Sequence, residues 1–153
     1  MYYFRFTKQQ QKVLMEILKS DEITFKFSFS SNYFILESQL DIQNCFDYIL
    51  DYFICNGLLK NDEPSRFGVE IENINQIINH QLVLNNSEND FSKKQPTKYL
   101  QARALYFNCK GNIDNLDNEN KKKYKKLNIP SWLEENWSIY INNKEIERKL
   151  KNN

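Results

Sequence analysis

The segment Asp41-Ile-Gln-Asn-Cys-Phe-Asp-Tyr-Ile-Leu-Asp-Tyr-Phe-Ile-Cys-Asn56, followed by Gly57, has the clearest helical pattern in the chain. At 100° per residue, its large apolar side chains fall on one broad face made by Ile42, Phe46, Ile49, Leu50, Phe53 and Ile54. The opposite face holds Asp41, Asn44, Tyr48, Asp51 and Tyr52. Gly57 suits the C′ position that follows a helix. The pattern predicts an amphipathic helix over residues 41–56 with its apolar face buried.

The residues before this helix predict another helix and a β-hairpin. Apolar residues recur at helical spacing over 7–19, and Thr7 is a suitable N-cap. Apolar and polar residues then alternate over 23–29, which is typical of a half-buried strand. A polar turn at 30–32 leads to a second expected strand at 33–36.

The residues after the helix have weaker patterns. Pro64 favours a loop at 61–65, and spaced isoleucines predict a short helix over 69–78. We interpret residues 85–97 and 112–120 as loops, 138–141 as a strand, and 130–137 and 144–151 as helical. Residues 99–107 can form a strand or a helix, and Tyr106 and Phe107 favour the strand. The expected fold class is α+β, with a small antiparallel sheet packed against several helices. All 153 residues are expected to form a single domain, with a possible internal linker at 85–97.

The charge of the chain is unevenly distributed. Residues 1–90 hold 7 Lys/Arg against 13 Asp/Glu, whereas residues 91–153 hold 14 against 7, although the whole chain has a net charge of only +1. Such a chain can steer a charged partner to one face. Alternatively, the two halves attract one another within the fold.

Three further features indicate a cytoplasmic protein. The cysteines, Cys45, Cys55 and Cys109, are odd in number and lack C-x-x-C spacing, so they fit neither a disulfide framework nor a zinc site. The first residues do not resemble a secretory leader. No apolar run approaches the roughly 20 residues that span a bilayer, so we expect no membrane association.

Catalytic patterns are missing from the sequence. The one histidine, His80, has no neighbouring nucleophile pattern, and the three glycines are too dispersed for a phosphate-binding loop. Glu147 and Lys149 form an E-x-K triplet like that of some metal-dependent nucleases, but it lies in an expected terminal helix. We therefore expect no enzymatic activity, no metal and no cofactor, and a metal-dependent enzyme is the third hypothesis.

The basic half suggests nucleic acid as an alternative partner. Residues 121–126, with Lys93, Lys94, Lys98, Arg148, Lys149 and Lys151, can neutralise phosphates. In this alternative, Tyr124, Trp132 and Trp137 can stack on bases. The pI of about 7.6 is below that of most nucleic-acid-binding domains, so nucleic acid is not the expected partner. Any binding is expected to be weak and sensitive to salt.

The polar face of the helix at 41–56 is the more suggestive surface. Tyrosine is common among interface hot spots, and carboxylates form charge-assisted hydrogen bonds to basic partners. Tyr48 and Tyr52 combine with Asp41 and Asp51 on this face. The alternative is that Tyr48 and Tyr52 lie under another element of the same domain.

Residues 36–79 resemble small bacterial proteins, many of them candidate immunity proteins of toxin–immunity systems. The resemblance runs through Asp41, the helix that ends at Gly57-Leu58-Leu59, Asn61-Asp-Glu-Pro64 and Gly68-Val-Glu-Ile-Glu72. It ends at Ile77-Ile78-Asn79, where Asn79 replaces the usual acidic residue. The resemblance covers less than a third of the chain.

The resemblance implies a cytoplasmic inhibitor that binds a cognate toxin domain, such as that of a contact-dependent growth-inhibition system. Many such toxins are nucleases with basic clefts, which an acidic helix can block. The residues expected to bind the toxin are Asp41, Tyr48, Asp51, Tyr52, Asp62 and Glu63. The alternative is a nucleic-acid-binding or regulatory domain that uses the basic C-terminal half.

Overall fold

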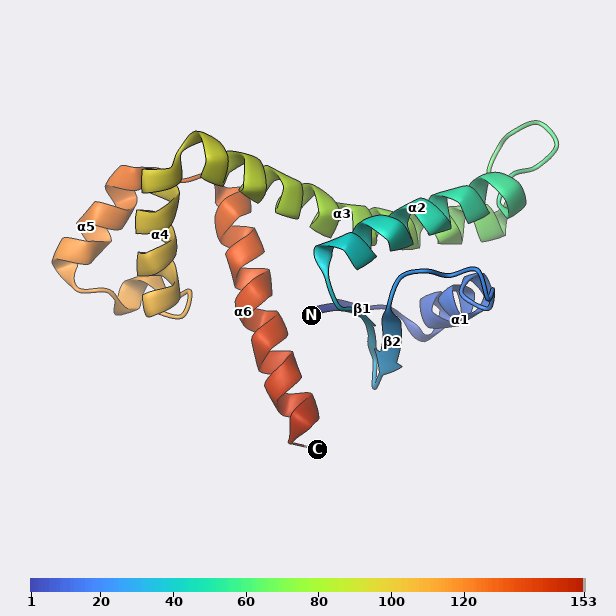
Figure 1. The fold of residues 1–153 in the computed structure, drawn as a ribbon, viewed down its shortest axis with the longest axis horizontal. Helices are drawn as coiled ribbons and strands as arrows, with labels where there is room; N and C mark the ends of the chain where they lie inside the picture. The colour runs from blue at the N-terminus through green and yellow to red at the C-terminus, as the bar shows by residue number, and fades with distance from the viewer. Residues whose placement is uncertain (153) are drawn as a thin grey trace. The chain divides into compact units, whose positions relative to one another are not determined.

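Three short strands near the N-terminus form an antiparallel sheet in the computed structural model, which describes residues 1–152. The strands are β1 (Tyr2–Arg5), β2 (Phe27–Ser30) and β3 (Tyr33–Leu36), in the order β1-β3-β2 (Figure 1). The central Phe34 lies opposite Phe4 on one side and Phe29 on the other. Aromatic pairs of this kind stabilise neighbouring strands. The predicted hairpin is confirmed, but its first strand begins at Phe27 rather than residue 23, and β1 was not predicted.

Helices cover this sheet to complete the first compact unit, Met1–Leu82. They are α1 (Lys8–Ile17), α2 (Gln39–Asn56) and the first part of α3 (Arg66–Lys94). Thr7 begins α1 with a capping box, as its side chain accepts a hydrogen bond from the Gln10 amide while Gln10 accepts one from the Thr7 amide. The core includes Phe34, Leu14, Ile17, Ile42, Ile49 and Ile74.

Two glycines bring α2 and α3 into backbone contact. A Cβ atom on Gly68 would lie 1.9 Å from the Gly57 carbonyl oxygen. Gly57 is the C-cap of α2 and has a φ of −101°, so it does not adopt the left-handed conformation expected of a C′ glycine. These positions require glycine because of close approach, not because of backbone conformation.

The second unit, residues 83–152 of the described chain, is helical. It contains the end of α3, α4 (Pro96–Asn108), the short 3-10 helix η1 (Ile113–Asn115), α5 (Asn118–Leu127) and α6 (Ser131–Lys151). Its core includes Phe91, Ala102, Tyr106, Leu116, Leu133 and Trp137. The strands predicted at 99–107 and 138–141 are therefore wrong, since these residues belong to α4 and α6. The linker predicted at 85–97 is also wrong, because α3 continues to Lys94 and α4 begins at Pro96.

A polar network joins three helices of the second unit. The Glu88 carboxylate on α3 accepts hydrogen bonds from the Tyr99 hydroxyl at 2.7 Å and from the Trp137 indole at 2.8 Å. It also accepts one from the Asn136 amide. Burial, followed by the bond to Glu88, raises the pKa of Tyr99 to about 12.

The α+β fold class is confirmed, and the charge division follows the two units. Met1–Leu82 holds 7 Lys/Arg against 11 Asp/Glu, a net charge of −4, whereas the residues from Val83 onward hold 14 against 9, a net charge of +5. That residues 1–153 form one domain stays a prediction. No helix within residues 1–152 combines the length and apolar character required to cross a bilayer.

Candidate functional site

Three of the six residues predicted to bind a partner line one depression in the first unit. This acidic depression, of about 330 Å³, is formed by Glu22, Tyr48, Asp51, Tyr52, Cys55 and Asn56. Five of these residues come from α2, where Tyr48, Asp51, Tyr52 and Cys55 follow the spacing of one helix face. Glu22 comes from the segment between α1 and β2. The carboxylates of Glu22 and Asp51 belong to exposed residues.

The two tyrosines of the acidic depression are held in place by the rest of the unit. The Tyr48 hydroxyl donates a hydrogen bond to the Ile17 carbonyl oxygen at 3.2 Å, and its ring lies edge-on to Phe25. The Tyr52 ring lies edge-on to Phe67, with centroids 6.3 Å apart. Both residues are half-buried. Each ring is therefore partly covered by the rest of the unit and partly accessible to a partner.

The inward face of α2 is rotated from the predicted one. Ile42, Cys45 and Ile49 are fully buried, and Tyr48 and Tyr52 also pack against the core. Leu50 and Ile54, which were predicted to be buried, are 40% and 56% exposed. The prediction was wrong at these two positions because α2 turns its tyrosine edge toward α1 and α3.

Asp41 has a structural role at the start of α2. Its side chain accepts hydrogen bonds from the Lys26 amide at 3.1 Å and from the Ser38 hydroxyl at 2.8 Å. The Ser38 hydroxyl in turn accepts one from the Asp41 amide and caps the helix. At a rise of about 1.5 Å per residue, Asp41 lies about 15 Å along the helix from Asp51. The structure therefore does not bring Asp41 into the acidic depression.

Asp62 and Glu63 lie in an exposed turn after α2. Asp62 has a φ of 64°, and its amide donates to the Leu59 carbonyl oxygen at 3.0 Å. The Leu59 amide donates to the Glu63 carbonyl oxygen at 2.7 Å. This turn leaves both carboxylates exposed beyond the end of α2. Neither residue lines the acidic depression.

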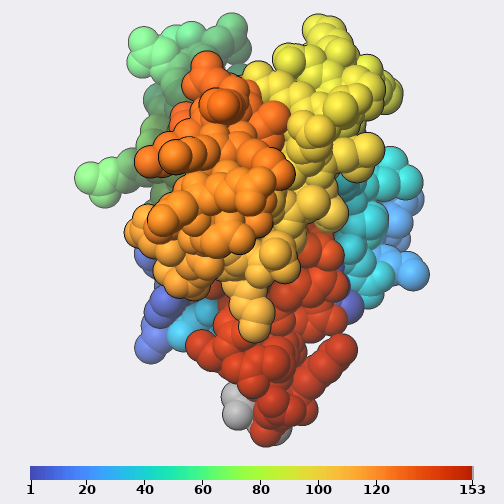
Figure 2. Space-filling view, turned by 90° about the vertical axis from the view of Figure 1, so that its left-hand side faces the viewer, coloured from blue at the N-terminus to red at the C-terminus, as the bar shows by residue number. Residues whose placement is uncertain are grey.

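The aromatic residues expected to stack on nucleic-acid bases are largely unavailable. Tyr124 and Trp137 are buried, with 6% and 1% of their surfaces exposed, and both belong to the core of the second unit. Trp132 is half-buried and lies edge-on to Phe91. The predicted stacking role is therefore wrong for Tyr124 and Trp137. The lysines around Tyr124 are accessible, since α5 lies at the surface beside α4 (orange and yellow in Figure 2).

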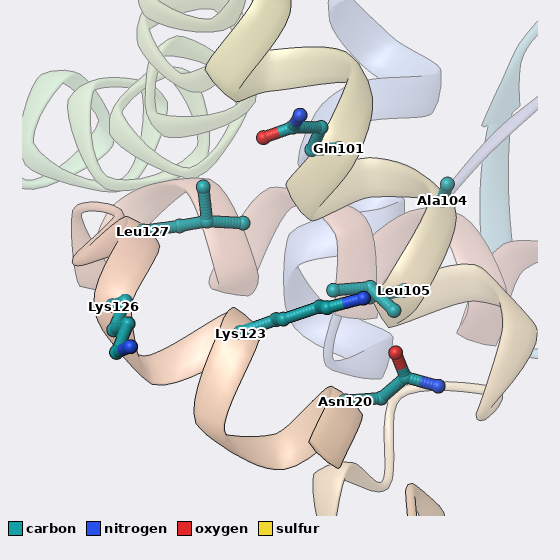
Figure 3. Close-up of a pocket in the computed structure, with 7 residues that line it drawn as sticks. All are labelled: Gln101, Ala104, Leu105, Asn120, Lys123, Lys126 and Leu127. Atoms are coloured by element: carbon teal, nitrogen blue, oxygen red, sulfur yellow. The ribbon is translucent and has the colours of Figure 1, made fainter.

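A groove between α4 and α5 is lined by apolar and polar side chains (Figure 3). Ala104, Leu105 and Leu127 supply its apolar part, and Lys123 extends from α5 toward α4. Its volume is about 520 Å³. Lys123 also pairs with Glu119 on α5 at 3.5 Å, which satisfies part of its charge. This groove contains no aromatic ring on which a base can stack.

A second depression in the same unit combines aromatic rings with cations. This basic depression, of about 360 Å³, lies between α4 and α6 and is lined by residues that include Phe107, Lys110, Tyr140, Lys144, Glu145 and Arg148. The Arg148 guanidinium, by hydrogen bonding, lowers the pKa of the Glu145 carboxyl. Sequence reasoning missed this site because residues 138–141 were interpreted as a strand. The four-residue spacing of Tyr140, Lys144 and Arg148 was the available signal.

The described residues do not bring together a set of metal ligands. Within residues 1–152, no three His, Cys, Asp or Glu side chains are placed to hold a metal ion. Cys45 and Cys109 are buried free thiols, Cys55 is an exposed one, and burial raises the pKa of the Cys45 thiol. His80, on α3, is exposed.

Comparison of the chain with protein-family models, with curated proteins and with solved structures finds no match.

Proposed function

We propose that this chain is an immunity protein that binds a cognate toxin domain through the acidic depression on α2. The observation that supports this proposal is the grouping of Tyr48, Asp51 and Tyr52 with Glu22 in one depression. The resemblance of residues 36–79 to immunity proteins points in the same direction. We further propose that the protein acts in a reducing cytoplasm and has no enzymatic activity of its own.

The chemistry of the acidic depression suits an arginine or lysine side chain of the partner. Two carboxylates, Glu22 and Asp51, can form charge-assisted hydrogen bonds to such a cation. The π faces of the tyrosine rings beside them attract a cation. Because the Tyr48 hydroxyl and both rings are already held by Ile17, Phe25 and Phe67, little side-chain entropy is lost on binding.

The charge of the first unit favours the same class of partner. Its net charge of −4 attracts a basic surface, such as the substrate cleft of a nuclease. Asp62 and Glu63 add exposed carboxylates beyond the end of α2. Exposed charges of this kind accelerate association more than they slow dissociation. In the proposed complex, Asp62 and Glu63 steer the toxin, and Asp51 and Tyr52 anchor it.

The test is co-purification with the C-terminal domain of the protein encoded by the neighbouring gene, the expected toxin, followed by measurement of the affinity. Tyr52→Ala and Asp51→Asn are each expected to weaken binding by about 1–4 kcal/mol, as expected for hot-spot residues. Asp47→Asn is the matched control. Asp47 is an exposed carboxylate on α2 one turn before Asp51, but it bonds to Gln43 and does not line the depression.

Three results would count against the proposal. The first is that Asp51→Asn and Tyr52→Ala both leave the affinity unchanged while the fold is intact by circular dichroism. The second is that Asp47→Asn weakens binding as much as Asp51→Asn does, which would reduce the effect to the net charge of the unit. A toxin that binds only the second unit would move the interface to α5 and α6.

A further inference from the structure

We infer that the basic depression between α4 and α6 binds single-stranded nucleic acid, with a base on Tyr140 and phosphates on the surrounding cations. The inference is independent of the proposed toxin binding, because it concerns the second unit and shares no residue with the acidic depression. It also differs from the nucleic-acid interface that the sequence suggests as the alternative, since it uses neither Tyr124 nor Trp137.

An accessible aromatic pair lies in the basic depression. Tyr140 is 47% exposed, whereas the other large aromatic residues of α6 are half-buried or buried. Its ring meets the half-buried Phe107 ring edge-on, with centroids 5.6 Å apart and an interplanar angle of 77°. Phe107 in turn packs edge-on against the buried Trp137. Tyr140 is thus anchored on the core and still presents a ring to a base.

Exposed cations surround this aromatic pair. The Arg103 guanidinium lies over the Phe107 ring, 4.6 Å from its centroid, and the Lys144 ammonium is 5.5 Å from the Tyr140 centroid. Lys110 and Arg148 line the same depression. All four residues are exposed, so their charges can reach phosphates without a change in the core. Alternating aromatic and cationic side chains are typical of surfaces that follow a single strand.

Glu145 is the one carboxylate that lines the basic depression. It pairs with Arg148, to which both of its oxygens are bonded, through Nε at 3.2 Å and through Nη2. A phosphate must compete with Glu145 for Arg148. Even so, four cations outnumber this carboxylate, and the whole unit has a net charge of +5, so an anionic partner is favoured.

A single strand fits this arrangement better than a duplex. The bases of a duplex are already stacked on one another, whereas a single strand can place an unstacked base on an aromatic ring. The neighbouring groove between α4 and α5 has lysines but no ring, and it can supply phosphate contacts only. Aromatic dependence of binding therefore distinguishes the basic depression from the lysines of α5.

The first experiment measures binding of the full chain to a fluorescein-labelled oligothymidine strand by fluorescence anisotropy. Tyr140→Ala and Tyr140→Leu are expected to weaken binding by about fivefold or more, while Tyr140→Phe retains it. With four phosphate contacts, the log–log dependence of affinity on salt should have a slope of about −3. Because Tyr140 is exposed, these variants should keep the wild-type circular dichroism spectrum.

The second experiment uses a matched pair of carboxylate variants. Glu145→Gln frees Arg148 and removes a repulsive charge, so it should tighten binding by up to about fivefold. Glu119→Gln has the same effect on charge but frees Lys123 on α5. It is expected to change affinity less than Glu145→Gln does. Both residues are exposed, so the difference reports where the strand lies.

Several outcomes would overturn the inference. They are no binding at low salt, equal binding by Tyr140→Ala and the wild type, or stronger tightening by Glu119→Gln than by Glu145→Gln. Inorganic polyphosphate that displaces the strand at the same phosphate concentration would show that the bases make no contribution. Adenosine monophosphate provides one base and one phosphate, so an affinity equal to that of the strand would assign the site to a free nucleotide instead.

Discussion

Gly57 and Gly68 illustrate how a single missing side chain sets the distance between two helices. A Cβ on Gly68 would meet the Gly57 carbonyl oxygen at 1.9 Å, which is closer than any real Cβ contact. The Ser65 hydroxyl donates to the same carbonyl oxygen at 3.1 Å, and the Ser65 amide does so at 2.8 Å. The end of α2 and the start of α3 therefore meet at a backbone contact that no larger residue fits.

We predict that Gly68→Ala destabilises the first unit by at least about 3 kcal/mol, the upper part of the range for overpacked sites. The clash is with backbone atoms, so a side-chain rotation cannot relieve it. Urea unfolding followed by circular dichroism measures the change. Val69→Ala is the control, because Val69 is 45% exposed and most surface substitutions change stability by less than about 0.5 kcal/mol. Equal effects of the two substitutions would contradict the close-approach argument.

Ionisation of Tyr99 makes the stability of the second unit depend on pH in the alkaline range. Its pKa is raised to about 12 in the folded chain, first by burial and then by the hydrogen bond to Glu88. In the unfolded chain a tyrosine ionises near pH 10. The stability that depends on protonated Tyr99 is therefore complete below about pH 10 and is lost as the pH rises toward about 12.

We predict that wild-type protein loses more stability than Tyr99→Phe between about pH 10 and 12. At neutral pH the Phe variant is the less stable of the two, because Glu88 loses a hydrogen-bond donor. The difference between the two proteins should shrink as the pH rises. Urea midpoints from circular dichroism at several pH values provide the measurement. A difference that stays constant with pH would mean that Tyr99 does not ionise on unfolding.

At the scale of elements, the rotation of α2 decides which of its residues stabilise the unit. We predict that Ile49→Ala costs about 2–5 kcal/mol, since Ile49 is fully buried. Leu50→Ala removes a side chain of similar volume that is 40% exposed, and it is expected to cost less than about 1 kcal/mol. Urea unfolding of both variants tests this. A larger loss of stability in Leu50→Ala than in Ile49→Ala would support the buried face that the sequence pattern predicts.

The first half of the chain is predictable because its strong local signals agree with its packing. Thr7, the alternation through Phe27 and Phe29, and the turn before Tyr33 each lead to the observed element. The face of α2 was misjudged because Tyr48 and Tyr52 count as polar in a simple pattern, yet their rings contribute apolar surface to the core. The same ambiguity made the acidic depression only partly predictable.

The second half was predicted poorly because polar residues interrupt its helical pattern. Asn85, Asn136 and Asn143 are buried, so the inward faces of α3 and α6 are not continuously apolar. Tyr106, Phe107 and residues 139–141 have high β-propensity, but tertiary packing in the helical core outweighs it. The network around Glu88 accounts for one of these residues, since Asn136 donates to its carboxylate.

At the scale of the whole chain, charge and core divide at the same place. The residues up to Leu82 form one core and have a net charge of −4, and those from Val83 form another and have a net charge of +5. The proposed toxin site lies in the acidic unit and the inferred nucleic-acid site in the basic one. Opposite charges on the two units therefore allow two partners of opposite charge to be attracted separately.

The two separate cores predict that each unit has its own unfolding transition. Both tryptophans, Trp132 and Trp137, lie in the second unit, so tryptophan fluorescence reports on that unit alone. Leu133→Ala, in the same core, is expected to lower the urea midpoint seen by fluorescence, at a cost of about 2–5 kcal/mol. Ile74→Ala, in the first core, is expected to leave the fluorescence midpoint unchanged. It should lower only the urea midpoint of the first unit, which circular dichroism detects as a separate transition.

A shared unfolding transition would contradict this prediction. If Ile74→Ala lowers the fluorescence midpoint as much as Leu133→Ala does, the chain unfolds cooperatively, as a single domain would. The helix α3 can transmit the loss in that case, because it runs from Arg66 to Lys94 and contributes residues to both cores. Val83→Ala is the control, because Val83 lies on α3 and is 51% exposed. It should leave the fluorescence and circular dichroism midpoints near the wild-type values. Independent transitions would show that an interface on one unit can be altered without loss of the other, which the separate toxin and nucleic-acid experiments both require.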